Sequence, residues 1–421
     1  MALCKDVEGG FVAWAVVISS FMIHFLQSGF SDSFGLILPS IKTVYETNNT
    51  EGSLTNSLTV FFTLGSSPVA AIFIKKIGHR LTMVVGVIFA FSGLLIAGLY
   101  TLLWKGNSDD HPNILVLYFS AGVMTGVGFG FTYLPSVDIV KMHFEKNLGL
   151  ACGIAASGTG FGQFVMAPIV SLLQYHYGLP GTLLGFSALF GASLIFCIFF
   201  SVPSSVNNNK IDGEENRKAK GFCEIFTGLK HPSKIFLILH VLLLNLCIYA
   251  IFTFYAERAI SFGISEENSS YLLSMMGFAN FISRITSGIV IDKFRSKAFT
   301  ILTAVHIING LSIISSQFIT SFPGQAVAAI IFGAGFGAKV TCMVVIVGII
   351  VEDITFLLSI IYLCVGISSF AGPTLVGILL DVSGSYLPGF MTVGGVFLLG
   401  AFCLPLSWWS LQKEQRLETQ F

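Results

Sequence analysis

Two cationic side chains stand inside long apolar stretches of this sequence. Arg284 lies in the stretch 269–292, and Lys339 lies in the stretch 324–350. A charge at the centre of a lipid bilayer costs about 2.5 to 3.5 kcal/mol, so such a residue requires a partner or a water-filled cavity. A guanidinium offers paired donors to a carboxylate, and Asn280 shares the helix face of Arg284 at a spacing of four. This pattern predicts an anion-binding site anchored by Arg284.

Both cations also have a structural interpretation. Arg284 could pair with an acid inside the helix bundle, and Asp32 and Asp138 are the candidates. We expect both acids to lie near helix ends, toward opposite faces of the membrane, which argues against such a pair. Lys339 could extend its long aliphatic stem until the ammonium group reaches water. Lys339 is therefore a second candidate for the site, with a structural role as its alternative.

Further polar side chains fall in other apolar stretches. The predicted site also includes Gln27, His24, Tyr133 and Asn245. His24 and Gln27 are three residues apart near the middle of their stretch and can share a helix face. His24 could titrate in the physiological range and bind a proton, whereas the plainer interpretation is a hydrogen-bonded contact between helices.

The sequence gives little support to an enzyme or to a cofactor site. It contains no Ser/His/Asp cluster, no paired catalytic carboxylates and no Cys/His pattern with metal-ligand spacing. The stretch Gly333–Lys339 is rich in glycine but lacks the Gly-Lys-Ser/Thr ending of a phosphate-binding loop. We therefore predict no catalytic residue, no metal and no nucleotide. Zero net charge also gives nucleic acid no electrostatic attraction.

These side chains must be positioned by helices that cross a membrane. Hydrophobic residues make up 54% of the chain and charged residues only 10%, which exceeds what a soluble core requires. About 20 apolar residues span the hydrocarbon layer, and this length predicts an all-α membrane protein with twelve spans. The expected spans lie near 11–38, 54–76, 80–104, 114–140, 147–174, 180–202, 234–257, 269–292, 297–319, 324–350, 354–379 and 386–410.

A repeated motif divides these spans into two sets. The sequence Gly-Val-Gly-Phe-Gly at 126–130 recurs as Gly-Ala-Gly-Phe-Gly at 333–337, each copy inside an apolar stretch. The repeat predicts two pseudo-symmetric six-helix halves, and substrate sites of such duplicated proteins lie between the halves near the bilayer midplane. The expected division is 1–202 for the first half, 203–233 for a cytoplasmic linker, 234–411 for the second half and 412–421 for a cytoplasmic tail.

Small residues mark one span as a close-packing helix. In the stretch 148–162, Gly149 and Gly153 are four residues apart, as are Gly158 and Gly162. Such spacing allows two helix backbones to approach closely. We expect either tight static packing or a surface on which helices slide.

The loop charges predict the orientation of the chain. When both termini are placed in the cytoplasm, most of the 22 Lys and Arg residues fall on the inner side. The inner set includes Lys75, Lys76 and Arg80, whereas Lys42 and Arg258 fall outside.

Several motifs resemble those of one transporter family. The opening Glu8–Trp14, the segment His143–Lys146, the segment Tyr255–Glu257, Arg284 and the segment Asp381–Tyr386 resemble the monocarboxylate porter family of the major facilitator superfamily. The likeness covers nearly the whole chain in the same order. It implies a major facilitator fold and secondary transport of a small monocarboxylate or related organic anion across the plasma membrane by alternating access. It leaves open a co-transported proton and a single-span accessory subunit.

Two positions depart from the lactate-carrying members of that family. Those members carry an Asp one helical turn before the arginine, where this chain has Asn280, and a Lys late in the first span, where this chain has Leu36. The proton-linked lactate mechanism is therefore not carried over. The alternatives are an uncoupled carrier of a zwitterionic metabolite or amino acid, and a non-transporting membrane receptor on the same scaffold.

Overall fold

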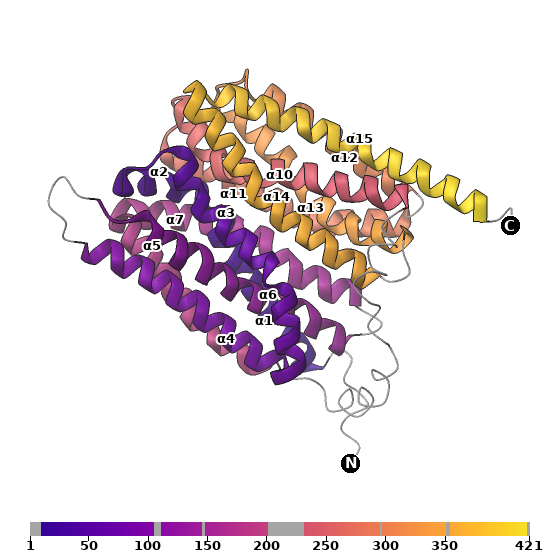
Figure 1. The fold of residues 1–421 in the computed structure, drawn as a ribbon, viewed down its shortest axis with the longest axis horizontal. Coiled ribbons are helices and arrows are strands. Elements are labelled where there is room, and N and C mark those ends of the chain that lie inside the picture. Colours follow the sequence, from indigo (N-terminus) through magenta and orange to yellow (C-terminus); the bar gives the residue numbers. More distant parts are fainter. Residues whose placement is uncertain are drawn as a thin grey trace, which may run out of the picture.

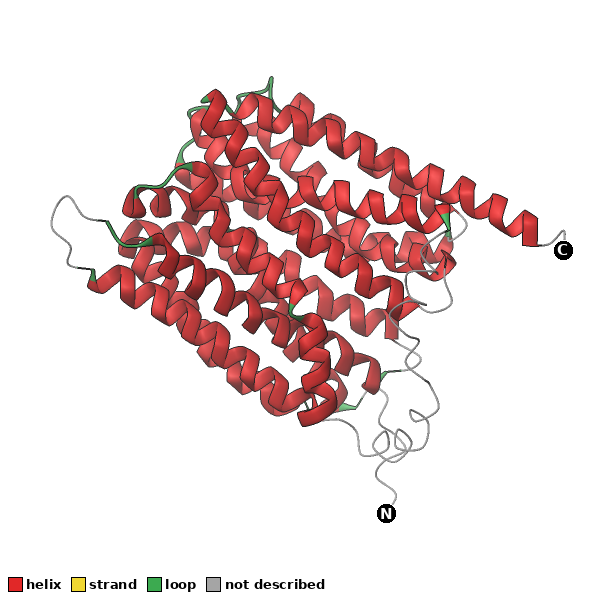
Figure 2. Cartoon of the chain, viewed as in Figure 1, coloured by secondary structure: helices red, strands yellow, loops and turns green. Residues whose placement is uncertain are grey.

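The computed structural model describes residues 10–104, 111–144, 148–200, 231–294, 297–350 and 354–418. Helices are the only regular secondary structure within these residues (Figure 2). The expected linker 203–233 lies almost entirely outside them, so its conformation and the domain boundaries stay predictions.

The helices fall into an N-terminal group and a C-terminal group. The N-terminal group contains α1 (Phe11–Asp32), α2 (Phe34–Tyr45), α3 (Asn49–Gly65), α4 (Ser67–Leu103), α5 (Ile114–Leu117), the π-helix η1 (Tyr118–Met124), α6 (Thr125–His143), α7 (Leu148–Ala192) and the 3-10 helix η2 (Ser193–Phe199). The C-terminal group contains α10 (Pro232–Ser261), α11 (Glu266–Lys293), α12 (Ala298–Ser315), α13 (Phe322–Ile350), α14 (Ile354–Ser383) and α15 (Tyr386–Glu418).

The described helices confirm the twelve predicted spans, with breaks that join or divide some of them. Helix α7 contains two spans, which meet at Gly178 with φ +62°, and α4 joins the end of the second span to the third at Gly78 with φ +82°. Glycine is favoured at both points because a residue with a Cβ rarely adopts a positive φ. The first span is divided at Ser33 into α1 and α2, and it ends at Tyr45 rather than near residue 38.

Each group packs mainly within itself. Helix α1 lies along α7 and α4 along α6, while α11 lies along α13 and α10 along α15. The indigo and magenta helices therefore gather on one side of the ribbon and the orange and yellow helices on the other (Figure 1). Two long contacts join the groups, one between α7 and α11 and one between α3 and α14. Helix α2 lies at the end of the bundle opposite to the C-terminal end of α15 (Figure 1).

The two copies of the glycine motif pack in corresponding ways. Gly126 and Gly130 of α6 face α3, while Gly128 faces α4. In the second copy Gly333 and Gly337 of α13 face α11, while Gly335 faces α12. A Cβ at any of these glycines would meet the neighbouring helix closer than 3.0 Å. The repeat in the sequence is therefore a repeat in packing, because each motif allows one helix to lie against two others.

The small-residue helix joins the two groups. Gly158 and Gly162 of α7 lie on the backbone of α1 at Phe21 and Phe25, whereas Gly160 faces Phe281 of α11. Among the residues that the structure describes, nothing lies within 4 Å of a Cβ built at Gly153. The close-packing prediction is thus confirmed for Gly158 and Gly162 and is wrong for Gly153.

We expect Gly158→Val to destabilise the protein, because the new side chain would overlap the Phe21 carbonyl group. Overpacking of this kind costs about 1 to 3 kcal/mol. Gly153→Val in the same helix is the matched control. Thermal melting in detergent should show a lower midpoint for Gly158→Val and little change for the control. Equal midpoints for the two variants would contradict the close packing of α1 and α7.

Candidate functional site

Arg284 occupies a buried position on α11 where that helix faces α7 and α13. Its Nε donates to Asn280 Oδ1 at 2.9 Å, and its Nη1 donates to the Ala156 carbonyl of α7 at 3.2 Å. The side chain is only 9% exposed. Among the described residues no carboxylate lies within 4.0 Å of the guanidinium. The predicted pairing of Arg284 with Asn280 on one helix face is therefore present, and it leaves the positive charge without a contacting acid.

Lys339 brings a second cation to the same region from α13. Its Nζ donates to Asn245 Oδ1 of α10 at 2.6 Å. Both cations lie near the Phe336 ring, with the guanidinium carbon of Arg284 at 5.8 Å and the Lys339 Nζ at 5.9 Å from its centroid. An aromatic face attracts cations at such distances. The structure therefore brings four of the predicted residues, Arg284, Asn280, Lys339 and Asn245, into one C-terminal cluster.

His24 and Tyr133 approach this cluster from the N-terminal group. Their rings meet edge to face with centroids 5.0 Å apart, and His24 Nε2 lies 3.3 Å from Ser136 Oγ of α6. Both residues interact electrostatically with Arg284. The cluster thus lies between the two helix groups, with α1 and α6 on one side and α10, α11 and α13 on the other.

Gln27 has a different environment from the other predicted residues. Its Nε2 donates to the Phe129 carbonyl at 3.0 Å and to Thr132 Oγ1 at 2.5 Å. Both acceptors belong to α6, so this amide joins α1 to α6. These bonds favour a structural role for Gln27 and separate it from the cation cluster.

Asp32 lies closer to the cluster than the sequence analysis expected. It is the last residue of α1, but α2 continues the span, so Asp32 lies inside the bundle and is 7% exposed. It interacts electrostatically with Arg284. The expectation that Asp32 lies near the end of its span is therefore wrong. Asp138, the other candidate partner, contacts His79 at 2.8 Å.

Tyrosines near the cluster were also missed by the sequence analysis. Tyr362 of α14 packs edge to face against Tyr133 with ring centroids 6.5 Å apart, and Tyr249 of α10 interacts electrostatically with Arg284 and Asp32. Tyrosine is common in membrane helices as a packing residue, and only the arrangement of the helices identifies these two.

Several buried polar atoms near the cluster have no hydrogen-bond partner among the described residues. They are His24 Nδ1, Asn280 Nδ2 and both amide atoms of Gln163. Gln163 lies on α7 where Gly277 of α11 approaches it. Buried polar groups are normally hydrogen-bonded, but unpaired buried atoms also occur elsewhere among the described residues, for example at His306 and Asn309, so these atoms do not by themselves mark a binding region.

An apolar groove lies outside the cation cluster. It has a volume of about 610 Å³ and an apolar lining from α7, α11 and α13, which includes Phe164, Phe278 and Ile330. None of the residues that line it belongs to the cation cluster. The groove therefore adds no charge recognition to the site.

Comparisons with known proteins show the family and the fold of the chain. The sequence model of the Major Facilitator Superfamily matches residues 17–352. The chain is 23% identical to monocarboxylate transporter 12 of Mus musculus, covering 96% of this chain and 87% of the relative. It is 24% identical to monocarboxylate transporter 4 of Gallus gallus, covering 96% and 84%. The partially occluded, inward-open structure of the xylose transporter XylE from E. coli matches with a TM-score of 0.70 at 12% identity, covering 93% of this chain and 98% of that chain. These findings confirm the predicted resemblance and fold.

The pairing of Lys339 with Asn245 can be tested through stability. Asn245→Leu leaves a buried ammonium group without its acceptor, and we expect a loss of about 1 to 3 kcal/mol. Lys339→Met removes the buried charge and should leave the melting midpoint unchanged or raise it. The double variant Asn245→Leu/Lys339→Met should recover most of the loss seen in Asn245→Leu. Thermal melting in detergent measures the stability of all three variants. If the change in the double variant equals the sum of the changes in the two single variants, the pair is not coupled.

Proposed function

The chain belongs to the major facilitator superfamily, and we propose that it is a secondary transporter of a small monocarboxylate or related organic anion. The cargo crosses the plasma membrane by alternating access, as the two helix groups rock about the site between them. Both termini face the cytoplasm in this proposal, so the α2 end of the bundle faces outward. The N-terminal and C-terminal groups are the two six-helix halves, with the boundaries given by the sequence analysis.

The observation that carries the proposal is that no carboxylate of the described residues contacts the buried Arg284. Its guanidinium is held by a neutral amide and a backbone carbonyl group. Neither partner cancels its charge, and a desolvated charge is costly until it is neutralised. A carboxylate on the cargo supplies both the negative charge and the planar acceptors that a guanidinium favours.

The charge balance of the region favours a cargo with one negative charge. In their ionised forms Arg284 and Lys339 carry two positive charges and Asp32 carries one negative charge. One monocarboxylate brings the formal sum to zero, which lowers the cost of burying the loaded site. The relatives named above are monocarboxylate transporters, and this similarity supports the same cargo class. The co-transported proton and the accessory subunit stay predictions from the resemblance.

Arg284→Gln should lower uptake of an anionic cargo by about thirtyfold or more, because losing one partner of a buried charged contact costs about 2 to 5 kcal/mol. The measurement is uptake from a panel of labelled carboxylates by protein reconstituted in vesicles. Arg284→Lys keeps the charge but loses the fork of donors, and we expect an intermediate rate.

Lys293→Gln at the exposed end of the same helix is the matched control and should transport normally. Normal uptake by Arg284→Gln at an equal amount of protein would remove Arg284 from the site. Binding of a carboxylate without uptake by the wild-type protein would favour a receptor instead of a transporter.

A second candidate cargo is a zwitterion such as an amino acid. This alternative is favoured by Asp32, because its buried carboxylate faces the same region as Arg284 and could accept a cationic group. Asp32→Asn distinguishes the two cargo classes. Zwitterion uptake should fall about tenfold when this charged acceptor is lost, whereas uptake of a simple monocarboxylate should persist. Equal loss of both cargoes would assign Asp32 to the structure of the site rather than to cargo choice.

A further inference from the structure

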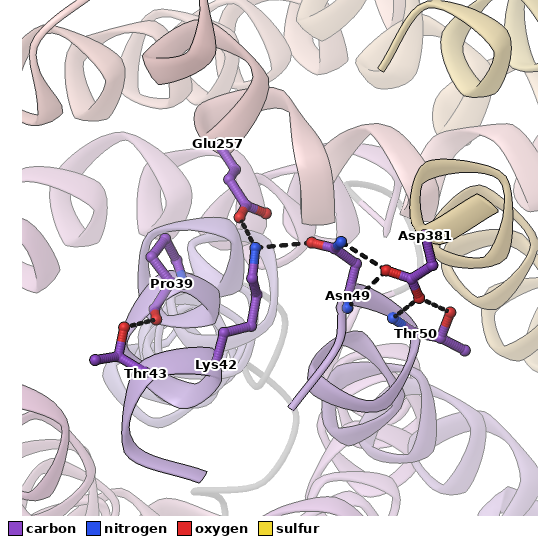
Figure 3. Close-up of polar contacts among 7 residues, drawn as sticks. All are labelled: Pro39, Lys42, Thr43, Asn49, Thr50, Glu257 and Asp381. Carbon is purple, nitrogen blue, oxygen red and sulfur yellow. Dashed lines mark hydrogen bonds and ion pairs between the residues drawn. The ribbon is translucent and has the colours of Figure 1, made fainter. Parts of the chain in front are cut away.

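At the α2 end of the bundle a charged contact joins the two helix groups. Lys42, in the last turn of α2, forms an ion pair with Glu257 of α10 and donates to Asn49 Oδ1 at 2.7 Å (Figure 3). The Lys42 side chain is 26% exposed and that of Glu257 only 12%. The pair is therefore partly shielded from water, where charges attract more strongly than on an open surface.

A second carboxylate completes the contact from α14. Asp381 accepts four hydrogen bonds from Asn49 and Thr50 at the start of α3 (dashed lines in Figure 3). The backbone N–H groups of Asn49 and Thr50 each lie 3.1 Å from the carboxylate, and Thr50 Oγ1 lies at 2.6 Å. The first N–H groups of a helix lack partners within the helix and favour a negative charge. Asp381 supplies that charge from the opposite helix group.

Close backbone contacts lie beside these charges. Gly35 of α2 abuts the Phe252 and Thr253 carbonyl groups of α10, and Gly377 of α14 abuts Thr50 of α3. A Cβ at either glycine would come closer than 3.0 Å to the facing backbone. The two helix groups are therefore in contact at this end.

Helix α10, which carries Glu257, is held firmly within the C-terminal group. Its neighbour Arg258 is fully buried and donates to Ser316 Oγ at 3.0 Å and to Gln325 Oε1 at 2.5 Å. The Phe390 ring lies 4.3 Å from the guanidinium carbon of Arg258. Since α10 is fixed to its own group in this way, separation of the groups must break the Lys42 contact rather than deform α10.

We propose that Lys42, Glu257 and Asp381 form the outer gate of this protein. The gate holds the two helix groups together while the outer side is closed, and its contacts separate when that side opens. Glu257 of the C-terminal group pairs with Lys42 of the N-terminal group, and Asp381 accepts hydrogen bonds from the N-terminus of α3. The attraction that closes the gate is therefore electrostatic. This inference rests on the proposed transport function, because only a protein that alternates between two states needs such a gate.

Accessibility from outside tests the gate without any cargo. Thr253→Cys places a thiol in the α2–α10 contact, and a membrane-impermeant methanethiosulfonate added outside reports how often that contact opens. Asp381→Asn and Glu257→Gln, each added to Thr253→Cys, should raise the labelling rate about tenfold, as expected for the loss of one charged contact. Glu266→Gln, an exposed acid at the start of α11, is the matched control and should leave the rate unchanged.

Labelling rates within about twofold of the Thr253→Cys parent for both gate variants would overturn the proposal, since a twofold change is only about 0.4 kcal/mol. Background labelling is measured on the same protein with Thr253 intact. The wild-type protein is assayed for uptake in parallel. Faster labelling together with absent uptake of every cargo would retain the gate and reject the proposed cargo class, so the two failures are distinguishable.

A cross-link tests the gate even if the charge variants fail to fold. Thr50→Cys/Asp381→Cys places two thiols where Thr50 Oγ1 and the Asp381 carboxylate are in contact. Oxidation to a disulfide should lock the outer side and abolish uptake, and a reducing agent should restore it. Oxidised protein that transports as fast as reduced protein would show that these positions need not separate, which would overturn the proposal.

Discussion

The arrangement of this protein depends on a buried guanidinium that no carboxylate contacts in the part of the chain that the structure describes. In a medium of low dielectric constant the charge of Arg284 acts on every polar group around it. The neighbouring helices provide an amide, a carbonyl group, an aromatic ring and a more distant acid. None of these neutralises the charge by contact, and the second cation, Lys339, increases the imbalance. The interior therefore favours an anion more strongly than a closed network of ion pairs would.

The glycine motifs allow this polar cluster to exist between tightly packed helices. In lipid, helices associate mainly through close packing, because the hydrophobic effect does not favour protein over lipid. Gly337 lies against the backbone of Asn280, so the small residue of α13 brings that helix to the residue that holds Arg284. Phe336 and Lys339 come from the same segment of α13. One short stretch thus provides both the close contact and part of the electrostatic environment.

Much of the fold could be predicted from the sequence, since lipid requires long apolar helices and these are visible as apolar runs. The site was predicted less completely. Arg284 and Asn280 share one helix, so their contact follows from helical periodicity, whereas Lys339 and Asn245 are distant in sequence and meet only through tertiary packing. Asp32 was misplaced because the first span was expected to end near residue 38, whereas α2 continues it to Tyr45. Lys42 was expected to be a residue of an outer loop and is instead in the last turn of a helix, in contact with Glu257.

The break at Ser33 has a mechanical consequence. Asp32 lies directly before it, and Lys42 lies near the far end of the short helix that follows. At about 1.5 Å per residue, Lys42 is roughly 14 Å from this joint, so a swing of about 10° in α2 displaces it by about 2 Å while Asp32 remains in place. The first span therefore has a hinge at Ser33, one residue after Asp32 of the binding region. A small backbone rotation at this hinge is enough to separate Lys42 from Glu257 at the end of α2.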